Sequence, residues 1–172
     1  MTGPGDVSSV GTLEFRVAMS RLAAGVSIVM TRDAEGRPCG LTATAVCSVS
    51  LRPPLVLASI SNLSTTHAAV AETGAFTLNF LGRGEEELAR RFAGPADGKF
   101  EGLGLETGTT GCPVLPSALA VCECVLDQAV AAGDHTLFVG RVVAVSVNTE
   151  AANDPLIHFG GAYGALSRGG GE

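Results

Sequence analysis

The sequence has no block of basic residues, no apolar run of membrane-spanning length and no signal-peptide pattern. Its 11 basic and 17 acidic residues give a net charge of −6. Binding to nucleic acid needs clustered lysine and arginine, so nucleic acid is not an expected partner. A membrane helix needs about 20 apolar residues in a row, so no membrane association is expected. Because the first residues also lack the charged-then-apolar order of a secretory signal, the expected location is the cytoplasm.

Signature motifs of several enzyme classes are missing as well. No GxGxxG follows a predicted strand and opens a helix, which argues against a Rossmann fold, and no GxxxxGK[ST] indicates a phosphate-binding loop. No GxSxG or Cys–His grouping points to a catalytic nucleophile. The three histidines, at positions 67, 135 and 158, lack ligand spacing, so no metal site is expected. A nicotinamide cofactor, if used, must therefore bind by another route.

The five cysteines do not predict a disulfide framework, because their number is odd and the expected compartment is reducing. Cys122 and Cys124 are two residues apart and would share one face of a strand. That spacing fits neither a redox CxxC motif nor a usual zinc pair. We interpret the cysteines as small buried apolar residues.

Length and composition predict one domain with an apolar contact surface. A chain of 172 residues matches a single domain. The expected organisation is a mobile tail over residues 1–11, a domain over residues 12–166 and a disordered tail over residues 167–172. Hydrophobic residues make up 46% of the chain and charged residues 16%. This composition is apolar for a monomer and favours an oligomer interface.

Hydrophobic patterning predicts a mainly β protein with a few short helices. Helices are expected over Thr12–Ala24, His67–Glu72 and Glu85–Phe92. Strands are expected over Val26–Thr31, Gly40–Ser50, Leu55–Ile60, Phe76–Leu81, Ala118–Val130, Thr136–Val147 and Pro155–Ala165. Antiparallel hairpins with few helices favour a closed barrel, which leaves no exposed sheet edge.

The stretch Gly40–Thr66 carries the clearest indication of a binding site. Its first strand presents small hydroxyl side chains on one face, and Leu55–Ile60 reads as a buried strand. Ser64 is a good N-cap for the helix that follows, and the unpaired N–H groups of a helix start attract anions, phosphate above all. A wall of small side chains also lets a flat ligand approach backbone amides. Together the two features suggest a site for a phosphorylated planar cofactor.

Six motifs occur in an order that resembles the flavin reductase family. They are GLTATAVCSVSLRPP, LVLASIS, SNLSTTHAAVAETGAFTLNFL, LARRFAG followed by KF, GDHTLFVGRV and PLIHFGGAYGAL. Members of this family are the small reductase components of two-component flavin monooxygenases. The resemblance extends over Phe15–Leu166 and implies a closed Greek-key split β-barrel of the FMN-binding type.

The resemblance also implies which residues bind flavin. The strand residues Thr42, Ala43, Thr44, Ala45 and Ser48 match those that touch the isoalloxazine ring, largely through backbone groups. Ser59, Ile60 and Ser61 would run beside the ring and the ribityl chain, and Ser64, Thr65 and Thr66 would bind the phosphate. The alternative readings are an ordinary strand with a hydroxyl face and a plain helix cap. Asn62 stands where many relatives carry lysine or arginine, which leaves the choice between FMN and FAD open.

Three further residues are candidates through the same resemblance. His135, in the motif Gly133-Asp134-His135, is expected to orient NADH and is the one catalytic candidate; a lone histidine in a turn is otherwise usually exposed and idle. Tyr163 would line the nicotinamide side, or else pack in the barrel. Phe100 would cover bound flavin, or else anchor its loop.

The resulting hypothesis is an NAD(P)H:flavin oxidoreductase that supplies reduced FMN or FAD to a separate monooxygenase. Cofactors carry the chemistry of hydride transfer, so the lack of an acid–base constellation agrees with this role. The resemblance implies a homodimer, and the absence of an arginine cluster favours NADH over NADPH. Two alternatives stay open. One is a flavin-using oxidase of the same fold, similar to pyridoxamine-phosphate oxidase, and the other is a flavin-binding module without enzymatic activity.

Overall fold

The computed structural model describes residues 9–95, 97–149 and 154–166. Most of the two predicted tails, residues 1–8 and 167–172, lies outside the described residues. The elements in chain order are α1 (Thr12–Met19), β1 (Ala24–Gly25), β2 (Ser27–Arg32), β3 (Pro38–Ala43), β4 (Val46–Leu51), β5 (Pro54–Ser61), α2 (Thr65–Thr73), β6 (Ala75–Phe80), the 3₁₀ turn η1 (Arg83–Glu85), α3 (Glu86–Ala93), β7 (Glu106–Thr107), β8 (Pro113–Val114), β9 (Ala120–Ala132), β10 (His135–Val147), β11 (Leu156–Phe159) and β12 (Ala162–Ala165). Among the described residues, no helix combines the length and the apolar character needed to cross a membrane.

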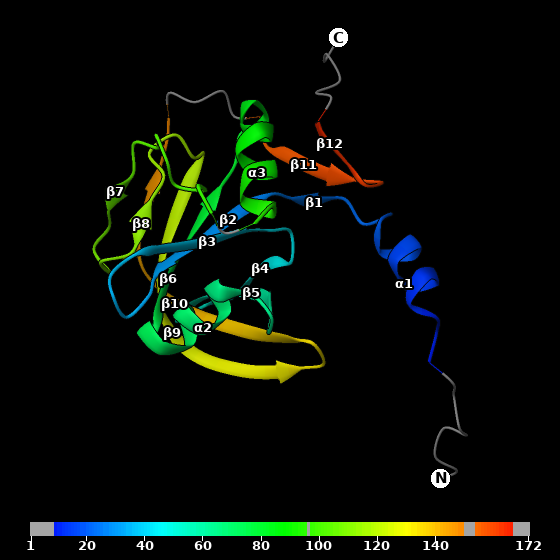
Figure 1. Cartoon of the computed structure of the whole chain (residues 1–172), viewed down its shortest axis with the longest axis horizontal. Helices are drawn as coiled ribbons and strands as arrows, with labels where there is room; N and C mark the ends of the chain where they lie inside the picture. The colour runs from blue at the N-terminus through cyan, green and yellow to red at the C-terminus, as the bar shows by residue number, and fades with distance from the viewer. Residues whose placement is uncertain (1–8, 96, 150–153, 167–172) are drawn as a thin grey trace.

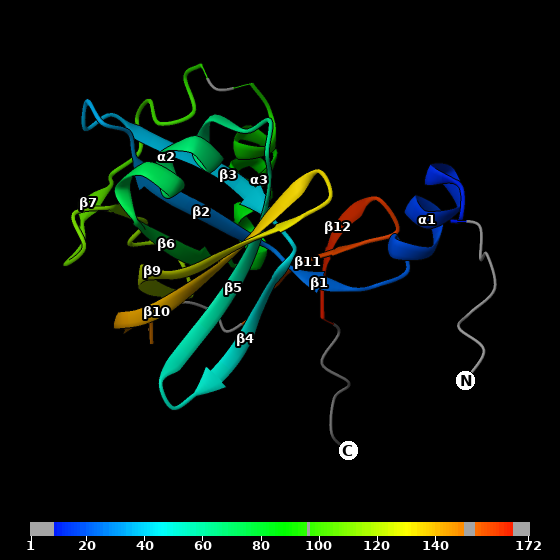
Figure 2. The same cartoon turned by 90° about the horizontal axis from the view of Figure 1, so that it is seen from below.

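A seven-stranded antiparallel sheet dominates the molecule, which confirms the mainly β prediction. Its strand order is β3-β2-β6-β9-β10-β5-β4. The predicted closed barrel is not observed, because no ladder joins the edge strands β3 and β4 among the described residues. The β4–β5 hairpin instead extends away from β2 and β3 (Figure 2). The sheet is therefore strongly curved but open at its two edges.

The single strand predicted over Gly40–Ser50 is wrong, because the chain changes its pairing partner within it. Residues up to Ala43 pair with β2, whereas residues from Val46 pair with β5. The peptide N–H of Ser59 donates to the carbonyl of Ala45 at 2.9 Å and holds the link between the two strands. This break turns the residues beyond Thr44 away from the face that strict alternation predicts.

The three helices follow their local signals to different degrees. For α2, the N-cap Ser64 and the C-cap Gly74, with a φ of 66°, are both as predicted. Helix α3 follows the 3₁₀ turn and has acids in its first turn and arginines in its last. Helix α1 ends at Met19 rather than near Ala24, and none of its residues is buried. It stands apart from the sheet (Figure 1).

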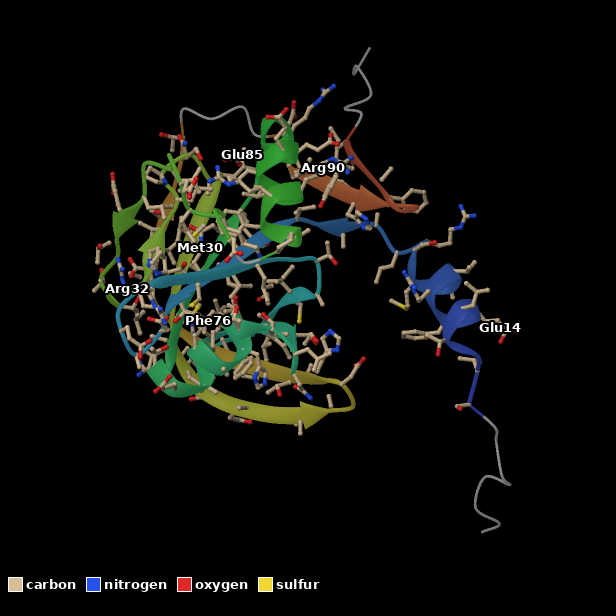
Figure 3. All side chains as sticks on the ribbon, viewed as in Figure 1. Glu14, Met30, Arg32, Phe76, Glu85 and Arg90 are labelled. Carbon is tan, nitrogen blue, oxygen red and sulfur yellow. The ribbon has the colours of Figure 1, made fainter. Side chains whose placement is uncertain are left out.

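Two apolar clusters form the core, one on each face of β2. Because β2 side chains alternate between its two faces, Ile28 and Met30 belong to one cluster and Val29 to the other. Phe92 anchors α3 in the first cluster and Phe76 centres the second, both fully buried. Figure 3 shows Met30 and Phe76 within the body of the molecule and Glu14 on the separate helix α1. This core fixes β3, β5 and both pocket helices relative to one another.

The segment Pro155–Ala165, predicted as one strand, forms a hairpin instead. Gly160 and Gly161 have φ values of 62° and 81° and make the turn between β11 and β12. The strand β11 also pairs with β1, which joins residues 24–25 to residues 157–158. All five cysteines are free thiols, as predicted, but only Cys112 and Cys124 are buried; Cys39 and Cys122 are half-buried and Cys47 is exposed.

Candidate active site

A pocket of about 560 Å³ lies between the end of β3, the end of β5, the start of α2 and the end of α3. Ten of the predicted site residues line it: Thr42, Ala43, Thr44, Ala45, Ser59, Ile60, Ser61, Ser64, Thr65 and His135. The other lining residues are Leu41, Leu63, Phe92, Ala93, Gly94 and Lys99. The sequence therefore located three of the walls and missed the one that α3 and the following loop contribute.

The remaining four predicted site residues do not line this pocket, so their contact with flavin stays a prediction. Ser48 lies in β4 opposite Val56, beyond the break in the strand. Thr66 is 1% exposed and faces the core under α2. Phe100 packs edge-to-face on Phe92, with ring centroids 5.0 Å apart. Tyr163 packs on the ring of His158 at 5.5 Å, and the guanidinium of Arg90 covers its face at 5.0 Å.

The start of α2 provides the part of the pocket that suits an anion. The Oγ of Ser64 accepts a hydrogen bond of 3.1 Å from the N–H of Thr66, and the Ser64 carbonyl accepts one from the N–H of His67. Among the described residues, no protein acceptor is recorded for the N–H of Thr65. That N–H group and the Thr65 hydroxyl can donate to a ligand, in the positive field of a helix N-terminus.

The β3 side of the pocket is a wall of small side chains and backbone. Ala43 is 6% exposed, while Thr44 and Ala45 are exposed at the break between the strands. The hydroxyl of Thr42 donates to the carbonyl of Ala89 at 2.6 Å, so its proton ties β3 to α3 and does not serve a ligand. A flat ring can lie against this wall without meeting a bulky side chain.

The turn at residues 133–135 places a histidine beside the same wall. His135 pairs with Ser61 across β10 and β5. Its Nδ1 lies 2.7 Å from Oδ1 of Asp134, and since the carboxylate accepts, Nδ1 carries the proton. This hydrogen bond, together with the charge of His135, lowers the pKa of Asp134. The pair leaves Nε2 of His135 available for a second partner.

A polar network that the sequence did not reveal holds this turn against α2. The N–H of Asn62 donates to the carbonyl of Asp134 at 3.0 Å, and its side-chain oxygen accepts from the hydroxyl of Thr136 at 2.9 Å. Because that hydroxyl proton is used, Nε2 of His67 donates to Thr136 at 2.8 Å. Asn62 therefore holds the turn, which gives this position a structural role. Contacts so distant in sequence leave no local signal.

Lys99 is the one charged residue among the six lining residues that sequence reasoning missed. Its side chain is buried, with 8% exposure, and its Nζ donates to the carbonyls of Phe92 at 2.8 Å and Gly40 at 3.3 Å. Burial lowers its pKa. The motif Lys99-Phe100 is part of the family resemblance, but the resemblance implied a role only for Phe100.

Comparisons with known proteins agree on one family. A family model described as a flavin reductase like domain matches residues 19–167. The chain is 38% identical over 159 residues to an FMN reductase (NADH), RutF, of Pseudomonas syringae pv. syringae, covering 91% of this chain and 88% of the relative.

Two solved structures have the same fold. The chain is similar to the styrene monooxygenase flavin reductase of Pseudomonas putida, with a TM-score of 0.81 and 28% identity over 90% of this chain and 97% of the other. It is also similar to an NADH:FAD oxidoreductase of Streptomyces globisporus solved with NAD and FAD fragments, with a TM-score of 0.85 and 27% identity over 92% and 94% of the two chains.

Proposed function

The chain belongs to the flavin reductase-like family, and we propose that it reduces FMN or FAD with NADH and releases the reduced flavin to a separate monooxygenase. The observation that carries this proposal is that one pocket combines three features. It joins a small-residue wall at Ala43–Ala45, an anion-attracting helix start at Thr65 and a histidine at position 135. The curated relative is an NADH-dependent FMN reductase, and the fold neighbours include the reductase component of a monooxygenase.

The residues present fit a flavin, which would supply the hydride acceptor when bound. The backbone and small side chains of Ala43–Ala45 would support the ring, and Ser59 and Ser61 would lie beside it. The Thr65 N–H and the hydroxyls of Ser64 and Thr65 would hold the phosphate. Asp134 keeps the proton of His135 on Nδ1, so that Nε2 can orient the nicotinamide amide. The chain itself then contributes binding, orientation and exclusion of water.

The test is NADH oxidation by the purified protein with and without added FMN, FAD or riboflavin. Oxidation that requires flavin and saturates with its concentration is expected. The preferred flavin would decide between FMN and FAD, and a parallel titration with NADPH would decide the electron donor. Oxygen consumption with a reduced substrate in place of NADH would favour the flavin-using oxidase, and tight flavin binding without turnover would favour the binding module.

His135→Ala is expected to lower kcat/KM for NADH roughly tenfold, because the nicotinamide loses an orienting partner. The dissociation constant of FMN should change less than twofold, since the phosphate-binding groups of α2 are untouched. Stopped-flow reduction and a fluorescence titration measure the two quantities. Gln128→Ala is the control, because Gln128 is exposed in β9 and is not among the residues that line the pocket. Equal effects of the two substitutions would remove the role given to His135.

The proposal includes a homodimer, supported by the unpartnered helix α1. Large apolar side chains of α1 and its flanks are exposed to solvent: Val10 by 67%, Leu13 by 74%, Phe15 by 55%, Val17 by 55%, Met19 by 45% and Leu22 by 61%. The helix stands away from the body (Figure 1). Several large apolar side chains exposed on one element are a feature of oligomer interfaces. A second copy of this chain would cover it.

The double substitution Leu13→Asp with Phe15→Asp is expected to convert the dimer to a monomer. Both side chains are more than half exposed in the single chain, so the change costs the isolated fold little. Sedimentation equilibrium measures the mass of the species, and Arg16→Ala on the same helix serves as the control. A wild-type protein that is already monomeric would contradict the proposed homodimer.

The five free cysteines are consistent with the proposed cytoplasmic location.

A further inference from the structure

Lys99 is the only lysine of the chain, and it lies buried in the wall of the pocket. The other ten basic residues are arginines. The burial of the single lysine is unusual, because lysine side chains are almost always on the surface. Its Nζ makes hydrogen bonds to two carbonyl groups, those of Phe92 and Gly40. An ammonium has three N–H donors, so one remains after these two bonds.

No carboxylate neutralises this charge within the described part of the chain. None of the ion pairs between described residues involves Lys99. The pocket wall contains no aspartate or glutamate, and its only other titratable side chain is His135. The titratable groups on the segments packed around Lys99 make no recorded hydrogen bond or ion pair with its Nζ: Cys39, Glu86, Glu87, Arg90, Arg91, Asp97 and Glu101.

Lys99 is held by close packing of the surrounding segments and by backbone carbonyls, not by an ion pair with a carboxylate. A Cβ on Gly40 would lie 2.9 Å from Cε1 of Phe92 and 3.2 Å from Cζ of Phe100. The glycine therefore allows the end of α3 and the Lys99 loop to close on β3. The carbonyl of Phe92 belongs to the last turn of α3, where the helix dipole favours a cation. A buried ammonium without a carboxylate is nevertheless costly, which indicates a role beyond packing.

We propose that the charge of Lys99 stabilises reduced flavin relative to oxidised flavin in this pocket. A hydride carries two electrons and one proton from NADH, leaves NAD⁺ and adds one negative charge to the flavin ring. A positive charge near the ring stabilises that added negative charge and so raises the reduction potential of the bound flavin. Lys99 is the one buried cation in the described pocket wall that can do this. The inference rests on the proposed function, since it requires flavin in this pocket.

The position of Lys99 favours the ring over the phosphate as its partner. Lys99 is tied to Phe92 and Gly40, on the α3 side of β3, whereas the phosphate-binding groups Ser64 and Thr65 lie at the start of α2. Both helices pack on β3, so the pocket spans the strand between them. A flavin with its phosphate at α2 directs its ring toward α3 and Lys99.

The first test uses the wild-type protein, because a single lysine gives a single side-chain signal. In protein labelled with ¹³Cε-lysine, the chemical shift of that carbon reports the pKa of Lys99. Reduced FMN, held under anaerobic conditions, is expected to raise this pKa by more than one unit relative to oxidised FMN. An equal pKa with both forms would overturn the inference, even if the protein reduces flavin normally. Absence of any FMN binding would overturn the proposed function as well.

The second test separates charge from hydrogen bonding. Lys99→Gln keeps an N–H donor for the two carbonyls and removes the charge, whereas Lys99→Arg keeps both. We expect Lys99→Gln to raise the dissociation constant of reduced FMN about tenfold and that of oxidised FMN less than threefold. The resulting ratio of about three- to tenfold lowers the two-electron potential of the bound flavin by about 15–30 mV. Lys99→Arg should retain the wild-type ratio.

A purely structural Lys99 would give a different pattern. Both forms of the flavin would then lose affinity equally in Lys99→Gln, and the potential would stay unchanged. In that case NADH oxidation by the wild type would still stand, and only the role of Lys99 would be lost. If both variants fail to fold, the ¹³C titration of the wild type decides alone.

Discussion

Thr65→Glu is expected to raise the dissociation constant of FMN by about two orders of magnitude without destabilising the protein. Thr65 is the first residue of α2 and lines the pocket. A carboxylate there faces the flavin phosphate, and two like charges about 5 Å apart repel by about 3 kcal/mol at an effective dielectric constant near 20. The same carboxylate is favourable for the helix itself, because it sits at the positive end of the helix dipole. Fluorescence titration measures the affinity, and thermal unfolding measures the stability.

Riboflavin provides an internal control for this result, since it has the ring and no phosphate. Its affinity should change less than threefold in Thr65→Glu. Ala71→Glu adds the same charge at an exposed position in the second half of α2 and should leave FMN affinity near that of the wild type. If Thr65→Glu weakens riboflavin and FMN alike, the phosphate lies elsewhere and the start of α2 binds another part of the ligand.

The helix α2 at the edge of the pocket could be predicted because its signals are local. An N-cap serine, a following helix and a glycine at the C-cap lie within eleven residues of one another, and they specify α2 through neighbouring backbone groups. The same holds for α3, with its acidic first turn and basic last turn. Short-range physics fixes these elements, so a single sequence displays them.

The break between β3 and β4 could not be predicted, because the residues there are Thr44 and Ala45. Neither is a proline or a glycine, the residues that usually mark the end of a strand. The chain turns there to pair with β5 instead of β2, a choice made by strands distant in sequence. The resemblance grouped Ser48 with Thr42–Ala45 on one continuous strand, whereas Ser48 lies in β4, outside the pocket wall. An undetected break shifts every later residue of a strand relative to its predicted face.

Lys99 was missed for a similar reason. Its partner Gly40 is 59 residues away in the chain, and the loop that carries it has no regular pattern. The network of Asn62, Thr136 and His67 also joins segments about 70 residues apart. Composition and periodicity detect neither. A buried lysine becomes visible only when the fold shows that no carboxylate pairs with it.

Gly140→Ala is expected to destabilise the fold by about 2–3 kcal/mol, through overpacking in the second apolar cluster. A Cβ at this position would lie 2.5 Å from Cζ of Phe76 and 2.8 Å from Cβ of Cys124. Both neighbours are fully buried and have no room to move. For a chain of this length the change corresponds to a fall in Tm of roughly 5–10 °C. Gly164→Ala is the control, because nothing lies within 4 Å of its added carbon.

A double-mutant cycle with Phe76→Leu identifies the cause of that loss. Leucine removes the ring atoms nearest to Gly140, so the two substitutions together should cost at least 1 kcal/mol less than the sum of the single changes. Additive costs, within about 0.5 kcal/mol, would show that the ring is not the obstacle. The cause would then lie in the backbone of β10, where the register with β9 shifts between Val139 and Gly140. Because β10 also pairs with β5 from Arg141 to His135, a backbone cause should weaken FMN binding, whereas a clash confined to the core should leave it intact.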